Sequence, residues 1–203
     1  MQIEPKNLYG VTDAGTPPIQ AKRDGARGLM RCTLRDATRS DHQQIDQALS
    51  RLKLADPGGY GVFLSIHLTA LSSLSTLWRP EDQADFAGLL CCLSDDLREL
   101  GCAHNVPEMT QATKSQSLRP WGVGYVIRGS RLGAAMLRQR VPAACPTSFL
   151  DFMPILTWPD FLKQLDREHL LMKPPAKTQT IRGAKQAFAA FAAAVTRAGL
   201  HNE

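Results

Sequence analysis

His42 is the first residue of this chain whose type and position could do chemistry. It lies four residues after Thr38, three before Ile45 and seven before Leu49, and this helical spacing turns its imidazole toward the interior. Asp46 follows one turn later, where a carboxylate can hold the Nδ1 proton and leave Nε2 to bind a metal. A hydrogen-bonded core histidine, or a plain His–Asp pair on a helix surface, would fit the same spacing.

A second feature is the glycine-rich segment 122–134 (GVGYVIRGSRLGA), inside a stretch that predicts a helix. Each interior glycine costs a helix about 1 kcal/mol relative to alanine, so something must require the bare backbone. Gly129 and Gly133 share one helix face at i and i+4. Either another helix packs closely against that face, or a flat ligand approaches it. A phosphate loop is not favoured, because no strand precedes the glycines and no Gly-Lys-Ser/Thr follows them.

These residues must be positioned by helices, which the apolar spacing predicts along most of the chain. The predicted helices span about 29–52, 63–77, 86–100, 119–139, 147–156, 157–170 and 178–198. Arg79-Pro80 and Pro174-Pro175 are read as helix breaks, and Gly101 and Gly199 as helix stops. No segment alternates with a period of two, so the sequence predicts an all-α domain.

Composition narrows the class of protein further. The chain has 203 residues and a net charge of +5, from 24 Lys+Arg against 19 Asp+Glu, a length typical of one domain. Residues 1–28 carry prolines and glycines without an apolar period, so we expect a flexible N-terminal tail before a domain at 29–203. The basic residues form no long run, which does not favour nucleic acid as a partner. We expect neither a membrane span nor a secretory signal, and therefore a cytoplasmic protein.

With these features in place, the chain resembles the heme oxygenase family. Residues 34–42 (LRDATRSDH), with Asp46 beyond, resemble the proximal helix of that family, and 125–134 (YVIRGSRLGA) resemble its glycine-bent distal helix, especially in the bacterial biliverdin-producing branch. Residues 161–167 resemble the segment whose basic residues meet the heme propionates, and 184–188 resemble the closing helix. The resemblance implies a single-domain, all-α heme oxygenase-like fold, with heme between the proximal and distal helices.

The resemblance also implies roles for individual residues. His42, oriented by Asp46, would ligate the heme iron, and Gly129 and Gly133 would leave room above it. Ser130 would hold the water that delivers protons. The other heme-contacting residues would be the basic groups near the propionates and two aromatic residues: Arg35, Lys163, Arg167, Tyr125 and Phe188.

The family's reaction uses O2 and electrons to open heme into biliverdin, CO and ferrous iron. Because the chain has no flavin or nicotinamide motif, an external electron donor such as a ferredoxin or a reductase is implied. A phytochrome would be a possible acceptor of the biliverdin. Two further functions stay open: a non-catalytic heme-binding or sensing protein of the same fold, and a related all-α enzyme that does not use heme.

Two positions depart from the family's pattern, and other histidines need an assignment. Many bacterial relatives have Glu where this chain has Arg128 and Gly where it has Ala134. Arg128 could face outward toward a reductase or inward toward a propionate, and the Ala134 methyl could narrow the pocket. His67 lies on an inward stripe and is predicted to be a core residue, whereas His169, like His104 and His201, is predicted to lie on the surface.

Overall fold

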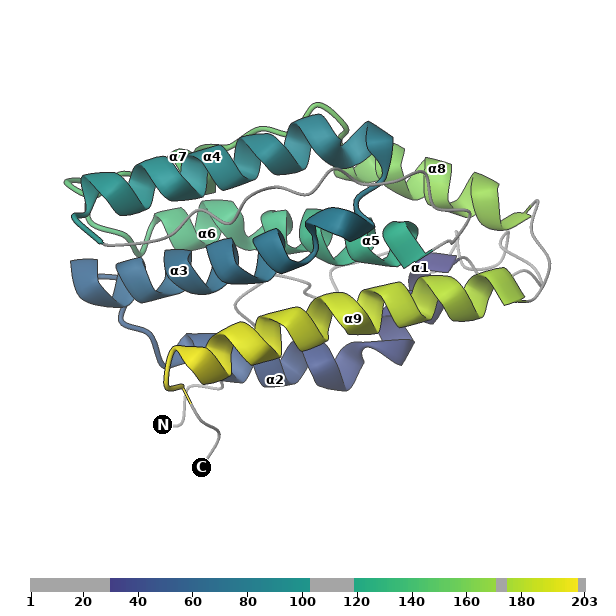
Figure 1. Cartoon of the computed structure of the whole chain (residues 1–203), viewed down its shortest axis with the longest axis horizontal. Helices are drawn as coiled ribbons and strands as arrows, with labels where there is room; N and C mark the ends of the chain where they lie inside the picture. The colour runs from purple at the N-terminus through teal and green to yellow at the C-terminus, as the bar shows by residue number, and fades with distance from the viewer. Residues whose placement is uncertain (1–29, 103–118, 171–174, 201–203) are drawn as a thin grey trace, which may run out of the picture.

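A computed structural model describes residues 30–102, 119–170 and 175–200, which consist of helices joined by short connections and contain no strand (Figure 1). The helices are α1 (Met30–Ala37), α2 (Arg39–Ser50), α3 (Pro57–Ser73), α4 (Gln83–Glu99), α5 (Arg119–Ser130), α6 (Ala134–Arg138), α7 (Ser148–Asp151), α8 (Trp158–Leu170) and α9 (Pro175–Arg197). Three 3-10 turns accompany them: η1 (Ser75–Leu77), η2 (Pro80–Asp82) and η3 (Arg131–Gly133). The all-α prediction is confirmed. The predicted tail at 1–28, His104 and His201 lie outside the described residues.

Several predicted boundaries are corrected by the structure. The predicted helix at 29–52 is divided at Thr38, whose backbone φ of −118° is not helical. The Thr38 hydroxyl donates to the Leu34 carbonyl at 2.8 Å. The predicted helix at 119–139 is interrupted by η3. Pro175, read as part of a helix break, instead begins α9, because proline suits the first helical position, where its missing N–H has no partner to lose. Gly101 and Gly199 do stop helices, with φ values of 70° and 77°.

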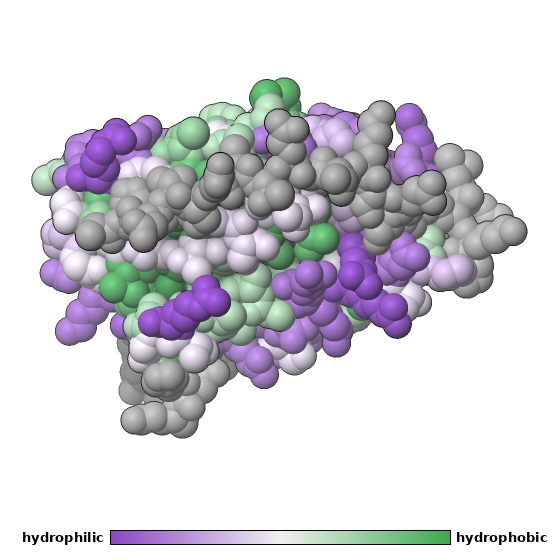
Figure 2. Space-filling view, in the orientation of Figure 1, coloured by the Kyte–Doolittle hydropathy of each residue, from purple (hydrophilic) through white to green (hydrophobic). Residues whose placement is uncertain are grey.

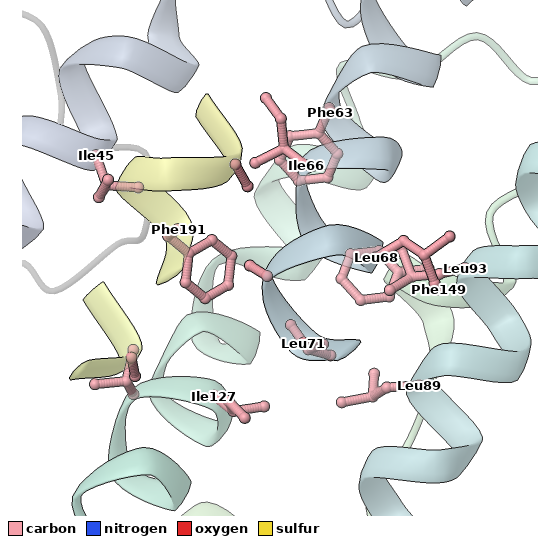
Figure 3. Close-up of a cluster of buried hydrophobic side chains, with 14 of the residues drawn as sticks. Ile45, Phe63, Ile66, Leu68, Leu71, Leu89, Leu93, Ile127, Phe149 and Phe191 are labelled. Atoms are coloured by element: carbon pink, nitrogen blue, oxygen red, sulfur yellow. The ribbon is translucent and has the colours of Figure 1, made fainter. Parts of the chain in front are cut away.

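One hydrophobic core joins the helices, and α3 lies at its centre (Figure 3). This helix is apolar on most of its circumference, which is the pattern of a helix surrounded by others. The buried side chains labelled in Figure 3 come from six helices, and α3 contributes four of them: Ile45, Phe63, Ile66, Leu68, Leu71, Leu89, Leu93, Ile127, Phe149 and Phe191. Packing of this kind fixes α2, α4, α5, α7 and α9 relative to α3.

The closest helix pair is α5 with α9, and glycine permits it. A methyl group added at Gly122 would overlap the carbonyl oxygen of Thr180, and one added at Gly183 would overlap the carbonyl oxygen of Arg119. Each helix therefore presents bare backbone to the other at the crossing. Close helix packing, one of the two explanations considered for glycines in this segment, accounts for Gly122.

Polar contacts complete the tertiary arrangement. The Asp96 carboxylate on α4 accepts the backbone N–H groups of Ser148 and Phe149, at 3.0 and 2.9 Å, and so holds the start of α7. His169 is not on the surface as predicted. It is buried, with Nδ1 donating to the Leu165 carbonyl at 2.8 Å and Nε2 lying 3.0 Å from the Thr180 hydroxyl, so it links α8 to α9.

The visible surface mixes hydrophilic and hydrophobic residues, as Figure 2 shows for one face. Among the described helices, none is both long enough and apolar enough to cross a bilayer.

The α5–α9 crossing gives a stability prediction. Gly122→Ala should lower the free energy of unfolding by about 2 kcal/mol, because overpacking against backbone costs up to ~3 kcal/mol and the gain in helix propensity returns only ~1 kcal/mol. Urea unfolding followed by circular dichroism measures the change. Gly129→Ala, in the same helix, is the control: its methyl would lie 3.5 Å from the Trp158 ring, an ordinary contact, and should leave stability unchanged or slightly raised. Equal behaviour of the two variants would contradict the role given to Gly122.

Candidate functional site

The His42–Asp46 pair expected from the sequence is present on α2. Nδ1 of His42 lies 3.0 Å from Oδ2 of Asp46, and the two side chains are 28% and 11% exposed. The contact is an ion-pair distance, and neither Asp46 oxygen has a hydrogen-bond partner among the described residues. A carboxylate in this position would hold a proton on Nδ1 and leave Nε2 as the atom that a metal could bind. The imidazole is thus placed at the edge of the core and not within it.

Helix α9 lies beside this histidine and also beside a second one. The His42 and Phe188 rings meet edge to face, with centroids 5.9 Å apart. Three residues further along α9, Phe191 meets the ring of His67 on α3 at 5.3 Å. The two phenyl rings of α9 therefore connect the environment of His42 with that of His67.

The glycine-rich segment changes from α-helix to a 3-10 turn at η3. Ser130 ends α5 and is half-buried, with its hydroxyl donating to the Ile127 carbonyl at 2.8 Å. Its oxygen retains lone pairs that can accept a hydrogen bond. Gly133 is buried in η3. Gly129 differs from Gly122, because among the described residues a methyl group added there meets only the Trp158 ring, at 3.5 Å. Packing within the protein therefore does not require a glycine at 129.

A small cavity of about 10 Å³ lies between α3 and η3, next to Ser130. This volume is close to the minimum that holds one water molecule. His67, Ser130 and Arg131 line it, together with Ala134 and apolar side chains. The Ala134 methyl, which was expected to narrow the pocket, borders this cavity.

His67 is buried as predicted and is held in its neutral form. Its Nδ1 donates to the Phe63 carbonyl at 2.8 Å, and burial, with the nearby Arg131 charge, lowers its pKa to about 4. A neutral imidazole with its proton on Nδ1 carries a lone pair on Nε2. The sequence predicted a core histidine here and gave no sign of the neighbouring cavity, because Ser130 is 63 residues away along the chain.

The residues expected near a propionate are partly brought together. Burial raises the pKa of Tyr125 to about 12, while the charge of Arg35 on α1 acts in the opposite direction, so the phenol stays protonated at neutral pH. Arg35 is exposed and 3.7 Å from Asp36. Lys163 is exposed and paired with Asp160 at 2.9 Å. Arg167 is exposed, and α8 is tied to the start of α1 by the Met30 N–H donating to Asp166 at 3.1 Å.

Arg128 takes neither of the two orientations considered for it. Its side chain is only 3% exposed and pairs with Asp82 at 2.6 Å and Asp85 at 2.9 Å. Asp82 ends η2 and Asp85 lies in the first turn of α4, so the positive charge is neutralised inside the protein. Arg128 therefore meets neither a docking partner nor a ligand directly.

The donor set around His42 suits one kind of metal site. The described residues contain no group of three or more His, Cys, Asp or Glu side chains that could hold a bare metal ion. A heme brings four nitrogen ligands of its own and needs only one axial ligand from the protein. A single oriented imidazole beside an aromatic ring meets that requirement.

A comparison with solved structures supports the fold of the chain. The NO- and CO-bound heme oxygenase from Neisseria meningitidis is similar to this chain with a TM-score of 0.60 and 18% sequence identity, over 87% of this chain and 96% of that one. This chain has the heme oxygenase fold. No family model and no curated protein matches its sequence. The assignment to this fold therefore rests on the shape of the chain and the order of its helices, because few residues are identical in the two proteins.

The neutral state of His67 gives a pH prediction. Its folded pKa lies below the usual value of 6.5, so the unfolded chain binds a proton that the folded chain does not. The stabilisation is complete above pH 6.5 and is lost as the pH falls toward 4. Between pH 7 and 4.5 the parent should lose about 2 to 3 kcal/mol more than His67→Gln, measured by urea unfolding. If the free energies of unfolding of the two proteins change with pH in parallel, His67 is not a buried neutral histidine.

Proposed function

We propose that this chain is a heme oxygenase, which binds heme through His42 and cleaves it to biliverdin, CO and ferrous iron. The observation that carries the proposal is the imidazole of His42, paired with Asp46 and packed against Phe188, within a heme oxygenase fold. Heme is both substrate and cofactor, and when bound it supplies the iron that activates O2. We assign the reaction to the cytoplasm and to the bacterial biliverdin-producing branch.

In this proposal several residues of the chain have separate roles around the heme. Asp46 holds the Nδ1 proton of His42 and keeps Nε2 as the ligand atom, while Phe188 restricts the tilt of the ring. A neutral imidazole is a weaker electron donor than a thiolate, which suits attack on the porphyrin over early O–O cleavage. We assign Gly129 and Gly133 to the distal side, where bare backbone would allow a flat ligand to approach closely.

Ser130 and the cavity beside it suit the handling of protons. The Ser130 hydroxyl donates to Ile127 and can accept from a water molecule, and a serine has no pKa near neutrality, so it positions water without titrating. Tyr125, protonated at neutral pH, can donate to a propionate, and Arg35 and Arg167 add positive charge on exposed sides of α1 and α8. Lys163 would have to leave Asp160 to join them.

Electrons must come from another protein, since heme cleavage consumes several of them. We propose a ferredoxin or a reductase as the donor, and the net charge of +5 favours an acidic surface on it. A phytochrome is the proposed acceptor of biliverdin.

Hemin titration tests the ligand. The parent should give a sharp Soret band, and adding a reductant in air should replace it with the broad red absorption of a bilin. His42→Ala should lose or shift the Soret band, whereas Gln43→Ala, an exposed neighbour on the same helix, should match the parent. A Soret band that persists under reductant indicates heme binding without turnover. A His42→Ala spectrum identical to the parent's would refute the ligand assignment.

Asp46→Asn tests the orienting pair. Removing the carboxylate charge weakens the hold on the Nδ1 proton and lowers the basicity of Nε2, so hemin affinity should fall by roughly 10-fold to 100-fold, as for other partners of metal-bound histidines. The measurement is the same titration at fixed pH, with circular dichroism to confirm that the variant is folded. An affinity within twofold of the parent's would show that Asp46 does not act on His42.

A further inference from the structure

Arg128 belongs to a buried cluster of four charged side chains. Arg79 donates to both oxygens of Asp82 at 2.6 Å, and Arg128 pairs with Asp82 and Asp85. None of the four residues is more than 6% exposed. Two positive and two negative charges cancel, which is the condition under which charges are tolerated in a protein interior.

The same cluster is hydrogen-bonded to the non-helical segment that leads into α8. The Asp85 carboxylate accepts the N–H groups of Ile155 and Leu156 at 2.6 and 3.2 Å. Arg128 donates to the Leu156 carbonyl at 2.7 Å. Both backbone groups of Leu156 are therefore held, although neither belongs to a helix.

Trp158 begins α8 only two residues after Leu156, and it lies against the face of α5 that carries Tyr125 and Gly129. Its ring centroid is 5.3 Å from that of Tyr125, and its edge is the only described group that a methyl group at Gly129 would touch. Arg128 precedes Gly129 directly in α5. The Arg128 guanidinium thus holds the backbone two residues before Trp158, and Arg128 itself directly precedes Gly129.

We propose that Arg128 is a positioning residue that sets the Trp158 ring against the Gly129 face and so limits the space there for a flat ligand. The proposal rests on the proposed function where it concerns heme, but the positioning of Trp158 does not. A planar guanidinium can serve Asp82, Asp85 and the Leu156 carbonyl together. A lysine ammonium is a point charge on a different stem and cannot reproduce that fork.

The first test uses the protein without hemin. The chain is labelled with 5-fluorotryptophan, and the fluorine resonance of Trp158 is assigned by its absence in Trp158→Phe. Arg128→Lys should shift or broaden this resonance. Asp85→Asn, which changes the same buried cluster from its α4 side, should do likewise. Arg98→Lys, an exposed arginine paired with Asp95 on α4, is the matched control and should leave it in place. If Arg128→Lys and Asp85→Asn both fold and both leave the Trp158 resonance unchanged, the proposal is overturned.

The second test asks whether Arg128 acts on heme through Trp158. Arg128→Lys should weaken hemin binding roughly tenfold in the parent but less than twofold in a Trp158→Ala background, because coupled residues are not additive. A penalty of the same size in both backgrounds would overturn the coupling. If the parent does not bind hemin at all, the proposed function fails, and the fluorine measurement still decides whether Arg128 positions Trp158.

Discussion

The close approach of α5 and α9 is the constraint on which the rest of the structure depends. At the crossing, Gly122 and Gly183 place backbone against backbone, and a single added methyl would force the helices apart. Helix α9 then carries Phe188 toward His42 and Phe191 toward His67, while α5 carries Ser130 toward the cavity. The distance between α9, which carries the aromatic neighbours of His42 and His67, and α5, which carries Ser130, is therefore set by Gly122 and Gly183.

Much of the fold could be predicted from the sequence, because helices that bury one face show it in their apolar spacing. The inward positions of Leu34, Ile45 and Leu49 follow from spacing alone, and so does the local pair of His42 with Asp46. The interruption by η3 was not predicted, because the spacing indicated one helix over 119–139. Gly122 and Gly129 look alike in sequence, and only the position of α9 separates a packing glycine from one that packing does not require.

What the sequence could not predict are contacts between residues far apart along the chain. Arg128 pairs with Asp82 across 46 positions, and a long basic side chain on a helix gives no sign of burial by itself. His169 was placed on the surface because its partner Thr180 belongs to the next helix. The division at Thr38 was missed for another reason: its hydroxyl competes for a backbone carbonyl, a local effect that leaves the apolar stripe intact.

The carboxylate of Asp96 has a consequence for the order in which the chain assembles. Four residues are too few for a free-standing helix, and the first two amides of α7 have their acceptor on α4, more than 50 positions earlier. This turn therefore has no stability of its own and forms only once α4 has docked. Deuterium uptake at the Ser148 and Phe149 amides accordingly reports the attachment of α4 to the rest of the bundle, which makes this short segment a local gauge of cooperative unfolding.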